Sequence, residues 1–274
     1  MTRERLELGI STCPNDTYTF HGLLTGEVDP CGFDFAIELL DVQALNERAA
    51  RGAFDAAKVS FAAALGLADD VVVLPVGAAL GRGVGPVVLA PRAPTTSDIV
   101  LAPGEGTTAA LLWRMFHGSE GKLQHVVFSE IMPALARGAA RRGVCIHEGR
   151  FTYGAWGLEL VEDLGATWER ATGLPLPLGG IVARNRLGAE RTARLTQALR
   201  NSLDHARAHP QRALTSMRRF AQEQSDQVLW QHVNLYVNDD TRSLSDEARR
   251  ALAALAQRAH AAGHVAHATQ FVLA

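Results

Sequence analysis

The sequence predicts an α/β fold with two lobes, and three observations support this prediction. Strand-like and helix-like segments alternate through the first 70 residues. Residues 71–76 and 85–90 are almost continuously apolar, which is typical of strands whose sheet is covered by helices on both faces. After the Pro-rich segment 91–97 a second alternation of strands and helices begins, which indicates a second lobe.

The first lobe is expected to open with a strand at residues 4–10, a turn and a helix. The turn contains Pro14, and Asn15 or Asp16 can cap the helix that continues to residue 24. Next come an alternating strand at 33–40, a helix at 42–52, and a short strand at 56–61 that leads into the alanine-rich segment 62–68.

The second lobe is expected to contain strands at 99–102, 125–128 and 144–147 and helices at 107–116 and 129–137. A Pro/Gly-rich segment, 174–180, then leads into a short strand at 181–183 and mainly helical sequence, ending with a helix at 245–262. We therefore expect a large α/β domain from residues 1–92 and 181–274, and a small inserted α/β domain from 93–180. The cleft between such lobes is a preferred place for a small-molecule site.

Composition limits the classes of partner. The 274 residues include 27 Lys and Arg against 29 Asp and Glu, a net charge of −2, which leaves no surplus to neutralise a phosphate backbone. The apolar stretches are far shorter than the roughly 20 residues that cross a bilayer. We expect neither a nucleic-acid nor a membrane partner. The N-terminus lacks the apolar core of a signal peptide, and three cysteines without C-x-x-C spacing favour free thiols, so we expect a cytoplasmic protein.

The loop 103–108, Pro-Gly-Glu-Gly-Thr-Thr, stands between a predicted strand and a predicted helix. Its glycines permit close approach of a ligand, and the first N–H groups of the helix favour an anion or a polar group. The loop has neither the P-loop lysine nor a full G-x-G-x-x-G pattern, so a carboxylate or hydroxyl ligand is favoured over a nucleotide. The alternative is a tight turn in which Thr107 is an ordinary N-cap.

Lys58 lies on a short strand of buried type, next to Val59 and Ser60. A buried ammonium needs a partner or a polar cleft, which makes Lys58 a candidate binding residue. The alternative is a lysine on an edge strand that reaches solvent. Ser60 has no G-x-S-x-G sequence around it, so a serine hydrolase is not indicated.

His147 follows the apolar run 143–146, which is expected to bring it to the end of a strand facing the cleft. An unperturbed histidine has a pKa of about 6.5 and can act as a general base at neutral pH. The alternative is a structural histidine. Glu148 is a doubtful partner because a continuing strand points it to the other face. The pattern His260, His264, His267 resembles a metal cluster, but Gly263 interrupts the helix, so no metal site is expected.

Four separated motifs occur in order, and together they identify a resemblance: Ser11 to His21 (STCPNDTYTFH), Lys58 to Phe61 (KVSF), Gly104 to Ala109 (GEGTTA) and Ile146 to Phe151 (IHEGRF). The chain resembles the 1,4-dihydroxy-6-naphthoate synthase family of the futalosine route to menaquinone. The resemblance covers almost the whole chain.

The resemblance implies a two-lobed periplasmic-binding-protein-like fold of the second type, with a hinge, used as a cytoplasmic enzyme. It implies a carbon–carbon lyase that converts cyclic dehypoxanthine futalosine to 1,4-dihydroxy-6-naphthoate without a cofactor. His147 matches the family's general base, and the matching substrate-binding residues are Lys58, Val59, Ser60, Thr107, Thr108, Asn15 and Asp16.

From the sequence we also expect Phe20, Phe61, Phe151 and Trp156 to wall the apolar part of the cleft. Two alternatives stay open: a non-catalytic protein that binds a small acid, and a chorismate dehydratase of the same fold. The opening Cys-Pro-Asn-Asp sequence favours the naphthoate synthase over the chorismate dehydratase.

Overall fold

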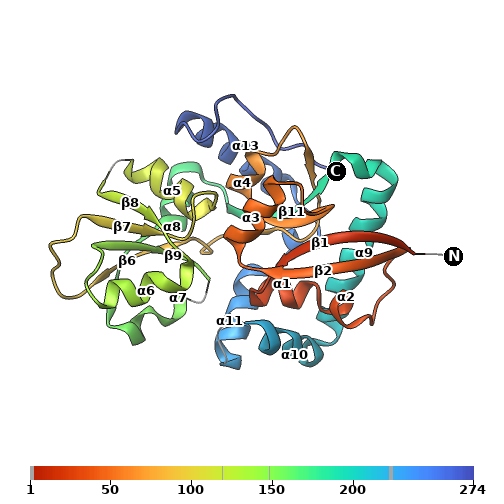
Figure 1. Cartoon of the computed structure of the whole chain (residues 1–274), viewed down its shortest axis with the longest axis horizontal. Helices are drawn as coiled ribbons and strands as arrows, with labels where there is room; N and C mark the ends of the chain where they lie inside the picture. The colour runs from red at the N-terminus through yellow and green to blue at the C-terminus, as the bar shows by residue number, and fades with distance from the viewer. Residues whose placement is uncertain (1–2, 119, 148, 222–224) are drawn as a thin grey trace.

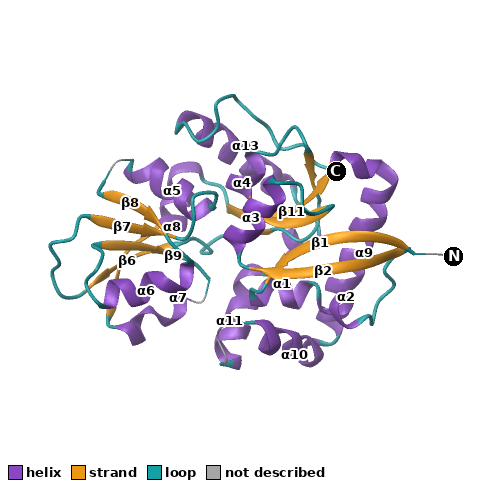
Figure 2. Cartoon of the chain, in the orientation of Figure 1, coloured by secondary structure: helices purple, strands orange, loops and turns teal. Residues whose placement is uncertain are grey.

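The computed structural model describes residues 3–118, 120–147, 149–221 and 225–274. It forms two α/β lobes, each built on its own β-sheet (Figure 1). Helices flank both sheets, as Figure 2 shows. The α/β class predicted from the sequence is therefore confirmed.

The sheet of the first lobe has the strand order β2-β1-β3-β11-β4, with β5 paired to β11. β1 runs parallel to β2 and β3, whereas β11 is antiparallel to β3, β4 and β5. The strands are β1 (Glu4–Ser11), β2 (Phe33–Leu40), β3 (Ala56–Ser60), β4 (Val71–Val73), β5 (Ala79–Gly81) and β11 (Leu176–Arg184). β3 lies between β1 and β11, and all five of its residues are buried.

The sheet of the second lobe has the order β10-β6-β9-β7-β8. Its strands are β6 (Val87–Pro91), β7 (Ile99–Ala102), β8 (Lys122–His125), β9 (Arg142–Cys145) and β10 (Leu158–Asp163). Segment 91–97 thus joins two strands of this one sheet, and the chain passes between the sheets in the stretches 82–86 and 164–175. The predicted domain boundaries at 92/93 and 180/181 stay a prediction.

Most helices lie near the predicted positions. Those of the first lobe are α1 (Pro14–Thr19), α2 (His21–Thr25), α3 (Val42–Ala50), α4 (Phe61–Leu65), α9 (Gly188–Ala208), α10 (Pro210–Phe220), α11 (Asp226–Tyr236), α12 (Asp239–Arg242) and α13 (Asp246–Ala261). Those of the second lobe are α5 (Thr108–His117), α6 (Phe128–Ala136), α7 (Gly149–Thr152) and α8 (Leu164–Thr172). Short 3₁₀ turns, η1 (Tyr153–Trp156) and η2 (Asn185–Leu187), complete the structure.

Two details differ from the sequence-based expectation. The single helix expected up to residue 24 is divided at Phe20, which joins α1 to α2. The strand expected at 125–128 lies at 122–125, because Gly121 turns the chain with a φ of 70° and β8 pairs with β7 directly afterwards. By contrast, the last predicted helix lies where it was expected, as α13: Ser245 accepts a hydrogen bond from the Ala248 N–H, and Gly263 follows the helix with a φ of 70°.

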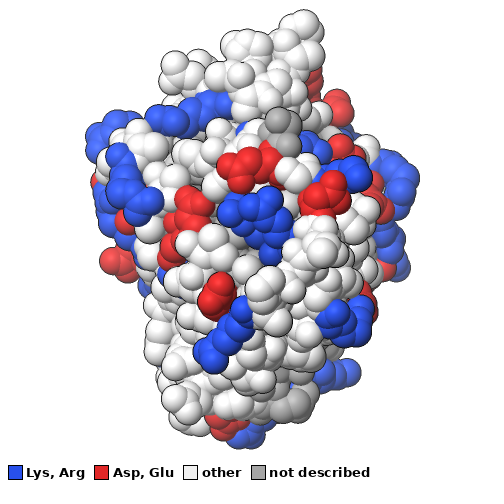
Figure 3. All heavy atoms as spheres, turned by 90° about the vertical axis from the view of Figure 1, so that its left-hand side faces the viewer, with Lys and Arg blue, Asp and Glu red and all other residues white. Residues whose placement is uncertain are grey.

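The largest apolar core joins the two lobes, since it contains residues of α4, α5, α8 and α13, among them Phe61, Trp113, Trp168 and Leu252. This packing holds the start of α5 against the first sheet. On the face at the far end of the second lobe, positive and negative side chains are interspersed (Figure 3). In the part of the chain that the structure describes, no helix is long and apolar enough to cross a membrane.

Candidate active site

A cleft lies where the ends of β1 and β3 meet the start of α5 and the end of β9, so both lobes contribute to it. It holds about 660 Å³ of empty space, counted out to its open mouth. The structure brings every predicted site residue to its lining: Asn15, Asp16, Lys58, Val59, Ser60, Thr107, Thr108 and His147.

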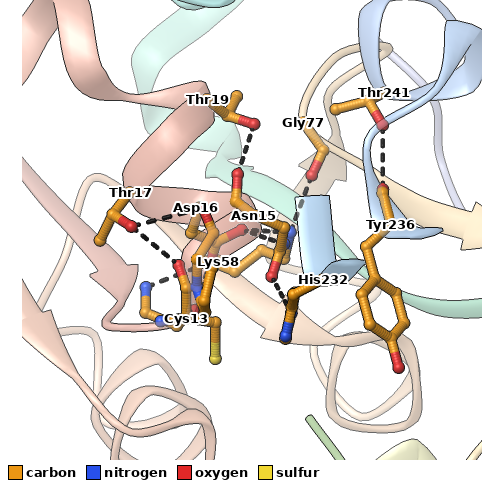
Figure 4. Close-up of polar contacts among 12 residues, drawn as sticks. Cys13, Asn15, Asp16, Thr17, Thr19, Lys58, Gly77, His232, Tyr236 and Thr241 are labelled. Atoms are coloured by element: carbon orange, nitrogen blue, oxygen red, sulfur yellow. Dashed lines mark hydrogen bonds and ion pairs between the residues drawn. The ribbon is translucent and has the colours of Figure 1, made fainter. Parts of the chain in front are cut away.

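Lys58 and Asp16 form a buried ion pair in the wall of this cleft (Figure 4). Nζ of Lys58 lies 2.8 Å from Oδ1 of Asp16 and donates to the carbonyl oxygen of Gly77 at 2.9 Å. The other carboxylate oxygen of Asp16 accepts from the hydroxyl of Ser11 at 2.7 Å. The two side chains are only 9% and 2% exposed. Lys58 is therefore not an edge lysine reaching solvent, because its strand is central in the sheet.

A chain of hydrogen bonds runs from this ion pair to a histidine that the sequence analysis did not single out. The side-chain NH₂ of Asn15 donates to Oδ1 of Asp16 at 2.8 Å. Its carbonyl oxygen lies 3.0 Å from Nε2 of His232, on α11. Burial, together with the neighbouring His147 and Lys58, lowers the pKa of His232 well below 6.5. The His232 ring is therefore neutral in the folded protein at physiological pH.

His147 enters the cleft from the end of β9 in the second lobe. Its φ is 56°, a left-handed conformation that is uncommon for a residue other than glycine and is often found at functional sites. Its Nδ1 lies 3.3 Å from Sγ of Cys13, which belongs to the first lobe. The ring of Phe128 packs edge-on against it at 4.8 Å. Glu148, considered above as its partner, lies outside the described residues.

The start of α5 forms a further part of the cleft lining, beside the end of β3. Thr107 is the N-cap, because its hydroxyl oxygen accepts from the Ala110 N–H, and it donates in turn to the carbonyl oxygen of Gly104 at 2.8 Å. The hydroxyl of Thr108 donates to the carbonyl oxygen of Leu178 in the first lobe at 2.7 Å. Both threonine hydroxyls thus fix the loop. Among the residues that the structure describes, none accepts from the N–H groups of Thr108 and Ala109, so these are the donors available to a ligand.

Asn46 on α3 connects Ser60 to this loop. Its side-chain oxygen accepts from the Ser60 N–H at 2.9 Å, and its NH₂ donates to the Ser60 hydroxyl and to the Gly106 carbonyl oxygen, each at 3.2 Å. Asn46 is almost completely buried. The only feature of the sequence that could have pointed to Asn46 is its position as a polar residue on the buried side of a helix.

The prediction that aromatic side chains wall the apolar part of the cleft is wrong. Phe20 and Phe61 are completely buried in two hydrophobic cores, and Trp156 is exposed. The apolar lining consists instead of aliphatic side chains and Tyr236. Large aromatic side chains close to the strand ends are drawn into the cores, where they exclude more apolar surface from water.

Among the described residues, one group has the side chains to hold a metal ion, and it lies outside the cleft. The possible ligand atoms of His21, Glu27 and His205 are within 4.8 Å of one another. His205 and Arg212 both contact the same oxygen of Glu27, at 2.7 and 3.4 Å, so the carboxylate is already paired with an arginine. His264, part of the histidine pattern that resembles a metal cluster in the sequence, contacts the Ala62 carbonyl oxygen instead.

Residues 6–261 match the model of a protein family described as menaquinone biosynthesis. The chain belongs to this family. It is 44% identical over 264 residues to a 1,4-dihydroxy-6-naphthoate synthase of Thermus thermophilus, covering 95% of this chain and 96% of the relative. It is 40% identical over 272 residues to the synthase of the same name in Streptomyces coelicolor, covering 97% and 96%.

Solved structures show the same architecture for this family member. A crystallised protein of Archaeoglobus fulgidus aligns with a TM-score of 0.90 at 27% identity, covering 95% of this chain and 98% of that one. The alkanesulfonate-binding protein of Xanthomonas axonopodis aligns with a TM-score of 0.69 at 12% identity, covering 99% and 97%. The latter likeness concerns the fold alone, and it confirms the expected periplasmic-binding-protein-like fold.

Proposed function

We propose that this protein converts cyclic dehypoxanthine futalosine to 1,4-dihydroxy-6-naphthoate in menaquinone biosynthesis, as a carbon–carbon lyase. The observation that carries the proposal is the placement of His147. This histidine projects in a left-handed conformation into a cleft built from both lobes of a chain whose relatives bear the synthase name. A cytoplasmic location is part of the proposal, in keeping with the free thiols of Cys31 and Cys145.

His147 acts as the general base in this proposal. Its neutral ring removes a proton from the sugar-derived part of the substrate, and the carbon–carbon bond to the ring that becomes the naphthalene then breaks. Aromatisation of that ring supplies the driving force. Cys13 and Phe128 both contact the imidazole and hold it in the orientation that the proton transfer needs.

The substrate's carboxylate is bound at the start of α5, where the N–H groups of Thr108 and Ala109 and the positive end of the helix dipole favour an anion. Thr107 shapes this turn. Lys58 adds positive charge from β3 of the first lobe, while Asp16 and Asn15 hold its position and that of His232.

Val59 and Ser60 complete the proposed substrate site from β3. Val59 is almost completely buried and supplies apolar surface to the cleft lining. Ser60 is held by Asn46 through its N–H and its hydroxyl. In this proposal the end of β3 therefore lies against the substrate.

The test is an incubation of the purified protein with cyclic dehypoxanthine futalosine, with chorismate in a parallel reaction. Chromatography with mass detection follows both products. We expect 1,4-dihydroxy-6-naphthoate from the first substrate and unchanged chorismate in the second. Dehydration of chorismate alone would assign the protein to the alternative enzyme, and binding of either compound without turnover would assign it to the non-catalytic binding proteins.

A further inference from the structure

His232 carries a buried ring nitrogen that forms no hydrogen bond with any other residue that the structure describes. Its side chain lies in the lining of the cleft and is 1% exposed. Within the described ranges of the chain, its Nδ1 has no hydrogen-bond partner, whereas its Nε2 lies 3.0 Å from Oδ1 of Asn15. Figure 4 shows the ring beside Asn15 and Tyr236. Buried polar atoms are nearly always paired, so an unpaired one in a cleft points to a ligand.

The neighbouring contacts determine what kind of atom this nitrogen is. Lys58 only donates hydrogen bonds, so Oδ1 of Asp16 is an acceptor, and the group of Asn15 that faces it must be the NH₂. The carbonyl oxygen of Asn15 therefore faces His232, whose Nε2 must carry the proton. In a neutral ring this leaves Nδ1 as a bare lone pair, which is a hydrogen-bond acceptor.

The surroundings of His232 keep its ring neutral. Lys58 is part of the same hydrogen-bonded chain, and the His147 ring lies 6.1 Å away on the cleft side. Asp16 is engaged by Lys58, Ser11 and Asn15, and Tyr236 packs on the ring at 4.5 Å. Burial opposes protonation most, the neighbouring His147 and Lys58 add to it, and together they hold the pKa of His232 well below 6.5.

We propose that Nδ1 of His232 accepts a hydrogen bond from a hydroxyl group on the part of the substrate that is next to His147. This inference rests on the proposed function, because His147 removes a proton from the sugar-derived part and that part carries hydroxyl groups. A carbonyl or carboxylate oxygen at the same place would set one lone pair against another. His232 is thus a substrate-binding residue that selects a donor at this position.

Two substitutions separate this role from a structural one. The amide nitrogen of glutamine can occupy the place of Nε2, so His232→Gln keeps the donor to Asn15 and loses the acceptor in the cleft. The side chain of asparagine reaches only as far as Nδ1, so His232→Asn keeps a cleft acceptor and loses the contact with Asn15. The measurements are kcat/KM with cyclic dehypoxanthine futalosine and the midpoint of thermal unfolding, each beside wild type.

We expect His232→Gln to lower kcat/KM about tenfold, because one neutral hydrogen bond to the substrate is lost. Its thermal stability should be nearly unchanged. His232→Asn is expected to be less stable than His232→Gln but to keep kcat/KM within about threefold of wild type. Wild-type kinetics for His232→Gln, or a larger kinetic loss for His232→Asn than for His232→Gln, would overturn the inference.

A second measurement does not depend on variants of His232. In the His147→Ala protein labelled with ¹⁵N-histidine, added cyclic dehypoxanthine futalosine should move the Nδ1 signal of His232 towards that of a hydrogen-bonded acceptor. An unmoved signal at saturating ligand would contradict the inference. The failure of the proposed function is a different result: wild-type protein would leave the substrate intact, and the same titration of wild type would then decide the role of His232.

Discussion

Replacing Lys58 by methionine removes the cation from a buried ion pair and leaves the carboxylate of Asp16 behind. Breaking such a pair costs about 3–5 kcal/mol, because a buried charge loses its compensation. We place the loss near the low end, at about 3 kcal/mol, because Ser11 and Asn15 still donate hydrogen bonds to Asp16. For a chain of this size the corresponding fall in Tm is roughly 6–12 °C.

The chain has only one other lysine, and it provides a matched control. Lys122 lies 3.1 Å from Asp98, but the two side chains are 75% and 59% exposed. Lys122→Met should therefore change stability by less than about 1 kcal/mol. Thermal unfolding followed by circular dichroism gives the Tm of both variants and of the double variant Lys58→Met/Asp16→Asn. The double variant has no unpaired buried carboxylate, so it should be more stable than Lys58→Met. Equal Tm values for Lys58→Met and Lys122→Met would refute this reasoning.

Two further predictions follow from the titration of buried groups. His232 is neutral in the fold but protonates in the unfolded chain below about pH 6.5. Its contribution to stability is therefore complete above that pH and is lost as the pH falls below it. The decline in Tm between pH 7 and 5.5 should be shallower for His232→Gln, and an identical decline would contradict this. Burial raises the pKa of Cys145 to about 12, so iodoacetamide at pH 8 should label it only after unfolding. Peptide mapping of the labelled protein checks this. Rapid labelling in the native protein would disprove its burial.

The sequence predicted which residues meet in the cleft better than it predicted the details of the fold. Lys58 could be predicted as a binding residue because an ammonium on a buried strand needs a partner. His147 could be predicted as a cleft residue because it follows an apolar run. His232 was not, since it lies in unremarkable helical sequence and its partner Asn15 is 217 residues away. The place where the chain passes between the lobes was not predicted. Segment 91–97 has the composition of a linker, yet it joins β6 to β7, and both strands belong to the second sheet.

The central claim is that His147 is the general base of a carbon–carbon cleavage, and the rate of the His147→Ala variant tests it most directly. A positioned base contributes on the order of 10²–10⁴ in rate. With cyclic dehypoxanthine futalosine at saturation, the variant should lose about that much kcat, while its affinity for 1,4-dihydroxy-6-naphthoate and its Tm stay close to those of wild type. Turnover by the variant at nearly the wild-type rate would contradict the account and place the base elsewhere in the cleft.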